Sequence, residues 1–212
     1  MGGVMRTEQI GIRLFAIAAA LTLSGVMLNC SGDEQPMANG TPPAHETALL
    51  KPFKQDLMHA LKTALDAGGP IEAMTACNIQ APGIAKANST GDVKMGRSSH
   101  RLRNPDNAPN EWVAPFLESM VEKPATRIPM RIETGDGIHR YVEPIFIQPI
   151  CLPCHGEEIS EDVSAILAEL YPDDAATGFK AGEFRGLFWM EYIEECLLLG
   201  RGPGCVSQRR RL

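Results

Sequence analysis

The chain has 212 residues, of which 44% are hydrophobic, so it is long and apolar enough for one domain with a sizeable core. Its formal net charge is −6 and its pI is about 5.4, so no broad cationic surface indicates nucleic acid as a partner. The one basic cluster, Arg209 to Arg211, is explained as well by a solvated tail as by a binding patch.

Residues 1–29 predict a signal peptide, because a short basic region precedes the uncharged apolar run 14–28. This run is shorter than the about 20 residues of a membrane-spanning helix. Cys30 follows directly, which is typical of a lipoprotein signal that is cleaved before a lipidated cysteine. An ordinary signal peptide is the alternative, because Asn29 is bulkier than the usual residue there. We expect an exported, periplasmic protein, with residues 30–45 as a flexible tether and membrane attachment if Cys30 is lipidated.

The next part of the chain has a helical pattern up to Gly68. Because proline is tolerated only in the first turn of a helix, Pro52 places the expected start near Ala48. Pro70 then opens a second helix, which Pro82 interrupts. The first helix has an apolar residue at every fourth position: Leu49, Phe53, Leu57, Leu61 and Leu65.

Extended runs, turns and short helices alternate from there to residue 193. In order we expect an extended run 92–99, a turn 103–107, a helix from about 110, strands 126–133 and 138–147 joined by a hairpin turn, a helix 160–170 and a strand 183–192. These elements predict an α+β domain over residues 46–193, with a small antiparallel sheet, a long N-terminal helix and helices around the rim of the sheet. Residues 194–212 predict a tail with little core character.

Residues 151–155 read Cys-Leu-Pro-Cys-His and directly follow the predicted hairpin. Two thiols three positions apart can add to the two vinyl groups of one haem, and the adjacent imidazole then lies beneath the iron. Together with the signal peptide, the motif predicts one covalently bound haem c. Cys151 and Cys154 are the expected attachment points, and His155 is the expected iron ligand.

Two other kinds of site use the Cys-x-x-Cys spacing. A thiol–disulfide redox site normally has its first cysteine at the start of a helix, and the flanks 148–150 and 156–158 do not indicate a helix that begins at Cys151. A zinc site needs a second close pair of ligands, which Cys196 and Cys205 do not supply. Those two cysteines are instead candidates for a short disulfide loop.

The order of features from Ala73 to Trp189 resembles a family of exported c-type-haem-binding domains with a PAS-like fold, which occur alone or as input modules of signalling proteins. Besides the haem motif, the segments that carry the resemblance are Ala-Cys at 76–77, Ala-Pro-Gly-Ile-Ala at 81–85, Gly-Arg-Ser at 96–98, Arg-Asn-Pro-Asp-Asn-Ala-Pro at 103–109, Tyr-Val-Glu-Pro-Ile at 141–145, Tyr-Pro-Asp-Asp-Ala-Ala-Thr-Gly-Phe at 171–179 and Gly-Glu-Phe-Arg-Gly at 182–186. This combination covers more than half of the chain and is more specific than the haem motif alone.

The resemblance implies that haem lies between the sheet and the helices, with His155 as the proximal ligand. It also implies that a cysteine from the N-terminal helical region, here Cys77, can bind the other face of the iron. A thiolate is a strong anionic donor that favours ferric iron. Burial as a small apolar residue and disulfide pairing are the alternatives for Cys77. Weaker candidates for the second ligand are Met74, His59, His100 and His139.

Arg97, Arg101 and Arg103 cluster beside the predicted turn. A guanidinium group can bind a carboxylate through two hydrogen bonds, so Arg97 is a candidate to hold a haem propionate, with Arg185 as a second one. For at least two of the three clustered arginines, we expect solvated loop charges instead.

These observations favour a haem-based sensor or signal-input module that responds to redox state or to NO, CO or O₂. Its output would pass to an unidentified redox or signalling protein. A periplasmic electron-transfer cytochrome c is the alternative, which a Met or His sixth ligand would favour. No distal acid–base pair is evident in the sequence, so we do not expect an enzyme.

Overall fold

The computed structural model describes residues 43–135 and 137–193. Cys30, the predicted signal peptide, most of the predicted tether and the tail with Cys196 and Cys205 therefore lie outside the described residues. Within the described part, no helix combines the length and the apolar composition that crossing a bilayer requires.

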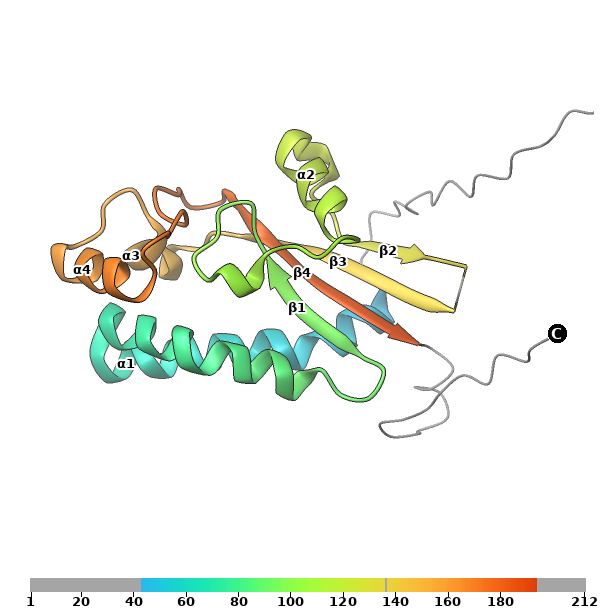
Figure 1. Ribbon diagram of the computed structural model, residues 1–212, viewed down its shortest axis with the longest axis horizontal. Helices are drawn as coiled ribbons and strands as arrows, with labels where there is room; N and C mark the ends of the chain where they lie inside the picture. Colours follow the sequence, from blue (N-terminus) through green and yellow to red (C-terminus); the bar gives the residue numbers. More distant parts are fainter. Residues whose placement is uncertain (1–42, 136, 194–212) are drawn as a thin grey trace, which may run out of the picture. The chain divides into compact units, whose positions relative to one another are not determined.

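A four-stranded antiparallel sheet forms the centre of the fold, in the order β1-β4-β3-β2 (Figure 1). Its strands are β1 (Lys94–Ser98), β2 (Met130–Glu133), β3 (Ile138–Phe146) and β4 (Phe184–Ile193). The predicted hairpin is confirmed, because β2 and β3 pair from Met130 opposite Val142 to Glu133 opposite His139. β4 pairs with both β1 and β3, so a strand late in the chain joins two earlier ones.

Helix α1 (Ala44–Asn88) is bent at Gly68 and Gly69 into two halves. Gly69 has a φ of 69°, a left-handed conformation that glycine adopts without strain. The Nδ2 atom of Asn88 donates a hydrogen bond to Oδ2 of Asp56 at 2.9 Å, which ties the end of the second half to the first half. The two halves run side by side in Figure 1, and the predicted break between two helices is confirmed.

The second half of α1 begins at Pro70, as predicted, but the predictions that Pro52 lies in the first turn and that Pro82 interrupts the helix were wrong. The first half begins earlier than expected and contains Pro52 in its interior, and the second half continues past Pro82. Pro52 and Pro82 are exposed, but the adjacent Phe53 and Ala81 are buried, so packing holds the helix beside each proline. The first turn is anchored by Glu46, whose buried carboxylate accepts a hydrogen bond from the Tyr192 hydroxyl at 2.6 Å. Beyond Pro82, Ile84 packs against the hydrophobic core beneath the sheet.

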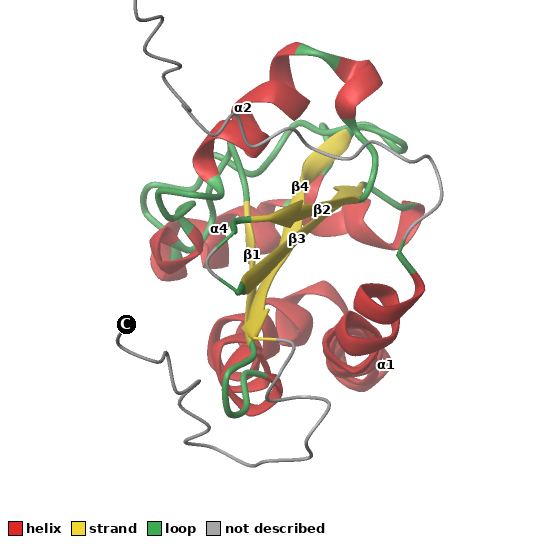
Figure 2. Cartoon of the chain, turned by 90° about the vertical axis from the view of Figure 1, so that its right-hand side faces the viewer, coloured by secondary structure: helices red, strands yellow, loops and turns green. Residues whose placement is uncertain are grey.

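Helices cover both faces of the sheet (Figure 2). The layer between the sheet and α1 contains Leu50, Phe53, Val93, Met95, Tyr141, Met190 and Tyr192. The layer beside α2 (Ala114–Glu122) contains Val113, Leu117, Met120, Met130, Ile132, Val142, Phe184 and Leu187. Helix α4 (Glu161–Leu170) packs on the second half of α1 through Met74. The predicted α+β class, with its long N-terminal helix, is therefore confirmed.

Gly186 lies in β4 at a point where the backbones of β1 and β4 come very close. Its φ is 155°, and a Cβ atom built on it would lie 2.2 Å from the carbonyl oxygen of Ser98. We expect Gly186→Ala to lower the free energy of unfolding by about 3 kcal/mol, because backbone strain and steric overlap add. Urea unfolding measures this change.

Gly83→Ala is the matched control for Gly186→Ala. Gly83 lies within α1, and a Cβ there would meet no atom within 4 Å. We expect this substitution to raise the free energy of unfolding by up to about 1 kcal/mol, because alanine favours a helix over glycine. If Gly186→Ala unfolds at the same urea concentration as the wild type, the close approach of the two strands is contradicted.

Candidate functional site

A cavity of about 440 Å³ lies between β1, both halves of α1 and the segment that carries the Cys-x-x-Cys-His motif. Pockets that hold cofactors and other small molecules measure about 300–1,000 Å³. The lining is mainly apolar, and it includes all the site residues predicted from the sequence: Cys77, Arg97, Cys151, Cys154 and His155. The fold therefore brings together predicted site residues that are far apart in the sequence.

The motif occupies a 3₁₀ turn (Pro149–Cys151) followed by the short helix α3 (Leu152–His155). The prediction that no helix begins at Cys151 was therefore wrong. The physical reason is that a proline near the start of each segment presets a helical φ. Because Cys151 and Cys154 are three positions apart in this turn, both face the cavity, and each is half-buried.

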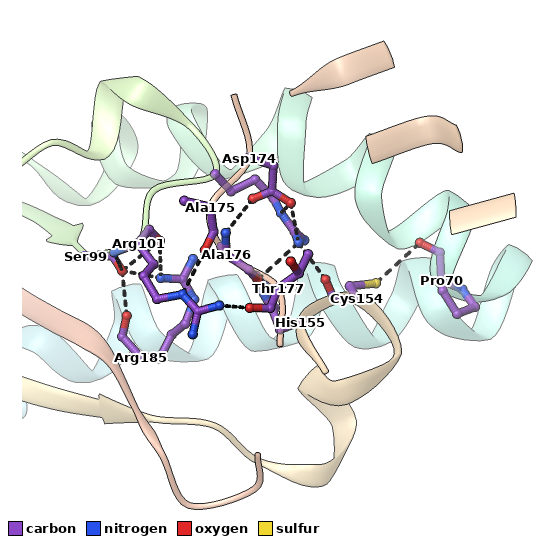
Figure 3. Close-up of polar contacts among 11 residues, drawn as sticks. Pro70, Ser99, Arg101, Cys154, His155, Asp174, Ala175, Ala176, Thr177 and Arg185 are labelled. Carbon is purple, nitrogen blue, oxygen red and sulfur yellow. Dashed lines mark hydrogen bonds and ion pairs between the residues drawn. The ribbon is translucent and has the colours of Figure 1, made fainter. Parts of the chain in front are cut away.

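The main chain holds one ring nitrogen of His155 (Figure 3). Nδ1 lies 2.6 Å from the carbonyl oxygen of Ala176, and because a carbonyl only accepts, Nδ1 carries the proton and Nε2 keeps a lone pair. Burial lowers the pKa of His155 to about 3, and the positive charges of Arg103 and Arg185 act in the same direction. The imidazole is therefore neutral at neutral pH, which is the form that binds a metal ion.

The loop that supplies the Ala176 carbonyl, residues 174–179, is attached to the motif by further main-chain hydrogen bonds. The Phe179 N–H donates to the carbonyl oxygen of His155 at 2.9 Å, and the Gly178 N–H donates to that of Gly156 at 2.7 Å. These bonds attach the loop to the motif next to the contact between the imidazole and its acceptor.

Two arginine side chains also hold the loop, those of Arg101 and Arg103. Arg101 donates from Nε to the Ala175 carbonyl at 2.9 Å and from Nη2 to the carbonyl of Thr177. Arg103 forms an ion pair with Asp174 at 3.0 Å, in which the two side chains are 11% and 8% exposed. The prediction that at least two of the clustered arginines are solvated was therefore wrong. Their partners lie more than 70 residues further along the chain, where a local pattern gives no signal.

Arg97 lines the cavity from β1. Within residues 43–135 and 137–193 it has no hydrogen bond or ion pair. Burial lowers the pKa of Arg97, and the nearby Cys77 and Tyr171 act against that shift. Burial also raises the pKa of Cys77, whereas the positive charges of Arg97 and Arg103 lower it. An enclosed guanidinium group without a carboxylate partner favours an anionic ligand in this cavity.

The weaker candidates for an iron ligand either lie outside the cavity or pack in the hydrophobic core. His100 stacks on Phe184, and His139 stacks on Tyr192, with ring centroids 5.6 and 5.3 Å apart. His59, His100 and His139 do not line the cavity. Met74 does line it, but its side chain is buried in the cluster between α1 and α4.

Comparison with known proteins places the chain in a family. A sequence model of the Tll0287-like family matches residues 50–192. The chain belongs to the Tll0287-like family. A solved structure, described as the crystal structure of the cyanobacterial heme-protein Tll0287, is 24% identical and has a TM-score of 0.49. The match covers 70% of this chain and 94% of that one. No curated protein matches the sequence.

Two features of the site were not predicted from the sequence: the Ala176 carbonyl and the carboxylate of Asp174. Both belong to the segment 171–179, which the resemblance singled out, and Arg103 belongs to the segment 103–109. In the sequence, only the presence of both segments in the resemblance indicated that they could be in contact.

The different surroundings of Arg97 and Arg103 lead to opposite predictions for the protein prepared without haem. We expect Arg97→Met to raise the free energy of unfolding by about 1 kcal/mol, because it replaces an unpaired enclosed charge by an apolar group. We expect Arg103→Met to lower it by about 3 kcal/mol, because Asp174 is then left buried without its cation. Thermal or urea unfolding of both variants tests this, and a comparable loss in Arg97→Met would mean that Arg97 has a structural partner.

Proposed function

We propose that this chain is an exported c-type protein with one haem, bonded through thioethers to Cys151 and Cys154 and bound at iron by Nε2 of His155. The observation that carries the proposal is the neutral imidazole with its free Nε2, next to two cysteine thiols in one cavity. The family takes its name from Tll0287, which is described as a heme-protein. Bound haem would supply an iron that changes oxidation state and binds small gases.

The charge of the cavity also fits haem. Haem carries two propionates, and the cavity offers two guanidinium groups without an ion-pair partner among the described residues, those of Arg97 and Arg185. Arg185 is oriented by a hydrogen bond from Nη1 to the carbonyl oxygen of Arg101 at 3.0 Å. We assign both arginines to the propionates, and we place the group between the sheet and the helices of a PAS-like domain.

Cys77 is the proposed ligand on the other side of the iron. It lies in the second half of α1 and lines the same cavity as His155. If a small ligand such as NO or CO displaced this thiolate, the second half of α1 would lose its bond to the cofactor. A local bond change would then become a movement of a helix, which favours a sensor or signal-input module over an enzyme. The signal would reach a redox or signalling partner in the periplasm, from a site attached to the membrane if Cys30 is lipidated.

The decisive experiment is a UV–visible spectrum of the protein expressed with c-haem maturation, with covalent haem measured on denaturing gels. We expect a low-spin ferric spectrum for the wild type and a high-spin one for Cys77→Ala, because that variant lacks the sixth ligand. Thr75→Ala is the matched control, since Thr75 lies on the same helix but does not line the cavity. We expect it to keep the wild-type spectrum.

Each other outcome has a defined meaning. Absence of covalent haem would reject the proposal and favour a thiol–disulfide site, with which the short helix α3 is also compatible. Covalent haem with an unaltered spectrum in Cys77→Ala would show that Cys77 does not bind the iron. The function would then be that of an electron-transfer cytochrome c.

Carbon monoxide tests the switching step separately. We expect the ferrous wild type to bind CO with a change in its spectrum, because the gas displaces the Cys77 thiolate. Cys77→Ala should bind CO faster, since no protein ligand has to leave first. A ferrous wild-type spectrum that stays unchanged under CO would count against a gas sensor, and stopped-flow absorbance measures the rates.

A further inference from the structure

Asp174 connects Arg103 to the main chain of the loop through both of its carboxylate oxygens (Figure 3). Oδ2 accepts hydrogen bonds from Arg103, from Nη2 at 3.0 Å and from Nε at 3.2 Å. Oδ1 accepts from the main-chain N–H of Ala176 at 2.8 Å. The carbonyl of the same Ala176 accepts from Nδ1 of His155. A continuous chain of contacts therefore runs from Arg103 through Asp174 and Ala176 to the imidazole.

Arg103 contacts both the motif and the loop. Its Nη2 atom lies 2.5 Å from the carbonyl oxygen of Cys154, the residue before His155. The same atom lies 3.4 Å from the carbonyl oxygen of Ala176, which binds the imidazole. One planar guanidinium group thus contacts the motif and the loop at once, and a lysine in its place could not make the same set of bonds.

We propose that Arg103 and Asp174 are positioning residues that fix the orientation and tautomer of His155, and thereby the reduction potential of the iron that it binds. The inference rests on the proposed function for its redox consequence. Partners that hold the second ring nitrogen of a metal-binding histidine set its orientation and its donor strength. Here the partner is a main-chain carbonyl. The residues that hold this carbonyl in place therefore also influence the orientation and donor strength of His155.

Two segments that are distant in the sequence meet in this arrangement. Residues 103–109 supply the guanidinium group, and residues 171–179 supply the carboxylate and the carbonyl. Arg101 contributes differently, because it holds the neighbouring carbonyls of Ala175 and Thr177 rather than the one that binds His155.

The test compares Asp174→Asn with Asp173→Asn in the haem-loaded, full-length protein. Both variants lose one negative charge at adjacent positions, but Asp173 is exposed, whereas Asp174 is paired with Arg103. We expect Asp174→Asn to favour reduction about tenfold, which corresponds to an upward shift of about 59 mV, because Arg103 becomes an uncompensated cation beside the motif. Asp173→Asn should leave the potential within a small fraction of that shift. Equal potentials for the two variants would overturn the proposal.

Arg103→Lys separates orientation from charge, because it keeps the positive charge but loses the planar fork. We expect its electron paramagnetic resonance g-values in the low-spin ferric state to differ from the wild type, with a smaller shift in potential than in Asp174→Asn. Wild-type g-values in Arg103→Lys would show that Arg103 does not position the imidazole.

Nitrogen-15 NMR of the full-length protein prepared without haem gives a readout that does not depend on iron. In the wild type we expect the proton of His155 on Nδ1, and in Asp174→Asn we expect an increased fraction with the proton on Nε2. An unchanged tautomer in Asp174→Asn would overturn the proposal. If the wild type carries no covalent haem, the proposed function fails, but this measurement still decides whether Arg103 and Asp174 position His155.

Discussion

The hydrogen bond between Nδ1 of His155 and the Ala176 carbonyl is the contact on which the organisation of the site depends. It joins positions 21 residues apart in the sequence. The loop lies on the motif through main-chain bonds, while Arg101 and Arg103 hold the loop carbonyls. Because a carbonyl can only accept, this one contact also decides which ring nitrogen is free for a metal ion.

Charge is the second constraint on the cavity. The guanidinium groups of Arg97, Arg103 and Arg185 all line it, and of these only Arg103 has an ion-pair partner in the part of the chain that the structure describes. Enclosing unpaired cations in a mainly apolar space is costly unless an anion joins them. A ligand with an apolar body and two carboxylates meets both conditions, which supports haem over a purely apolar ligand.

Local signals in the sequence were sufficient where neighbouring residues decide the structure. The helix predicted at 160–170 occurs at Glu161–Leu170, because the Ser160 side chain accepts a hydrogen bond from the Val163 N–H at its start. Distant contacts could not be predicted in this way. Pro82 failed to end α1 because packing around it compensates. The role of Asp174 could not be foreseen, since it consists of contacts with a side chain 71 residues away and with a main-chain N–H.

The position of β4 in the sheet has a consequence for the order of events during synthesis. β4 follows every other described element in the sequence, yet it lies inside the sheet between β1 and β3. The sheet therefore cannot form completely until residues 184–193 have left the ribosome. The strand that pairs with β1 lies some 90 residues later in the sequence. Residues 151–155 emerge before that strand. In the proposed haem protein, both attachment cysteines therefore precede the strand that completes the sheet, so bonding haem to them does not require a closed domain.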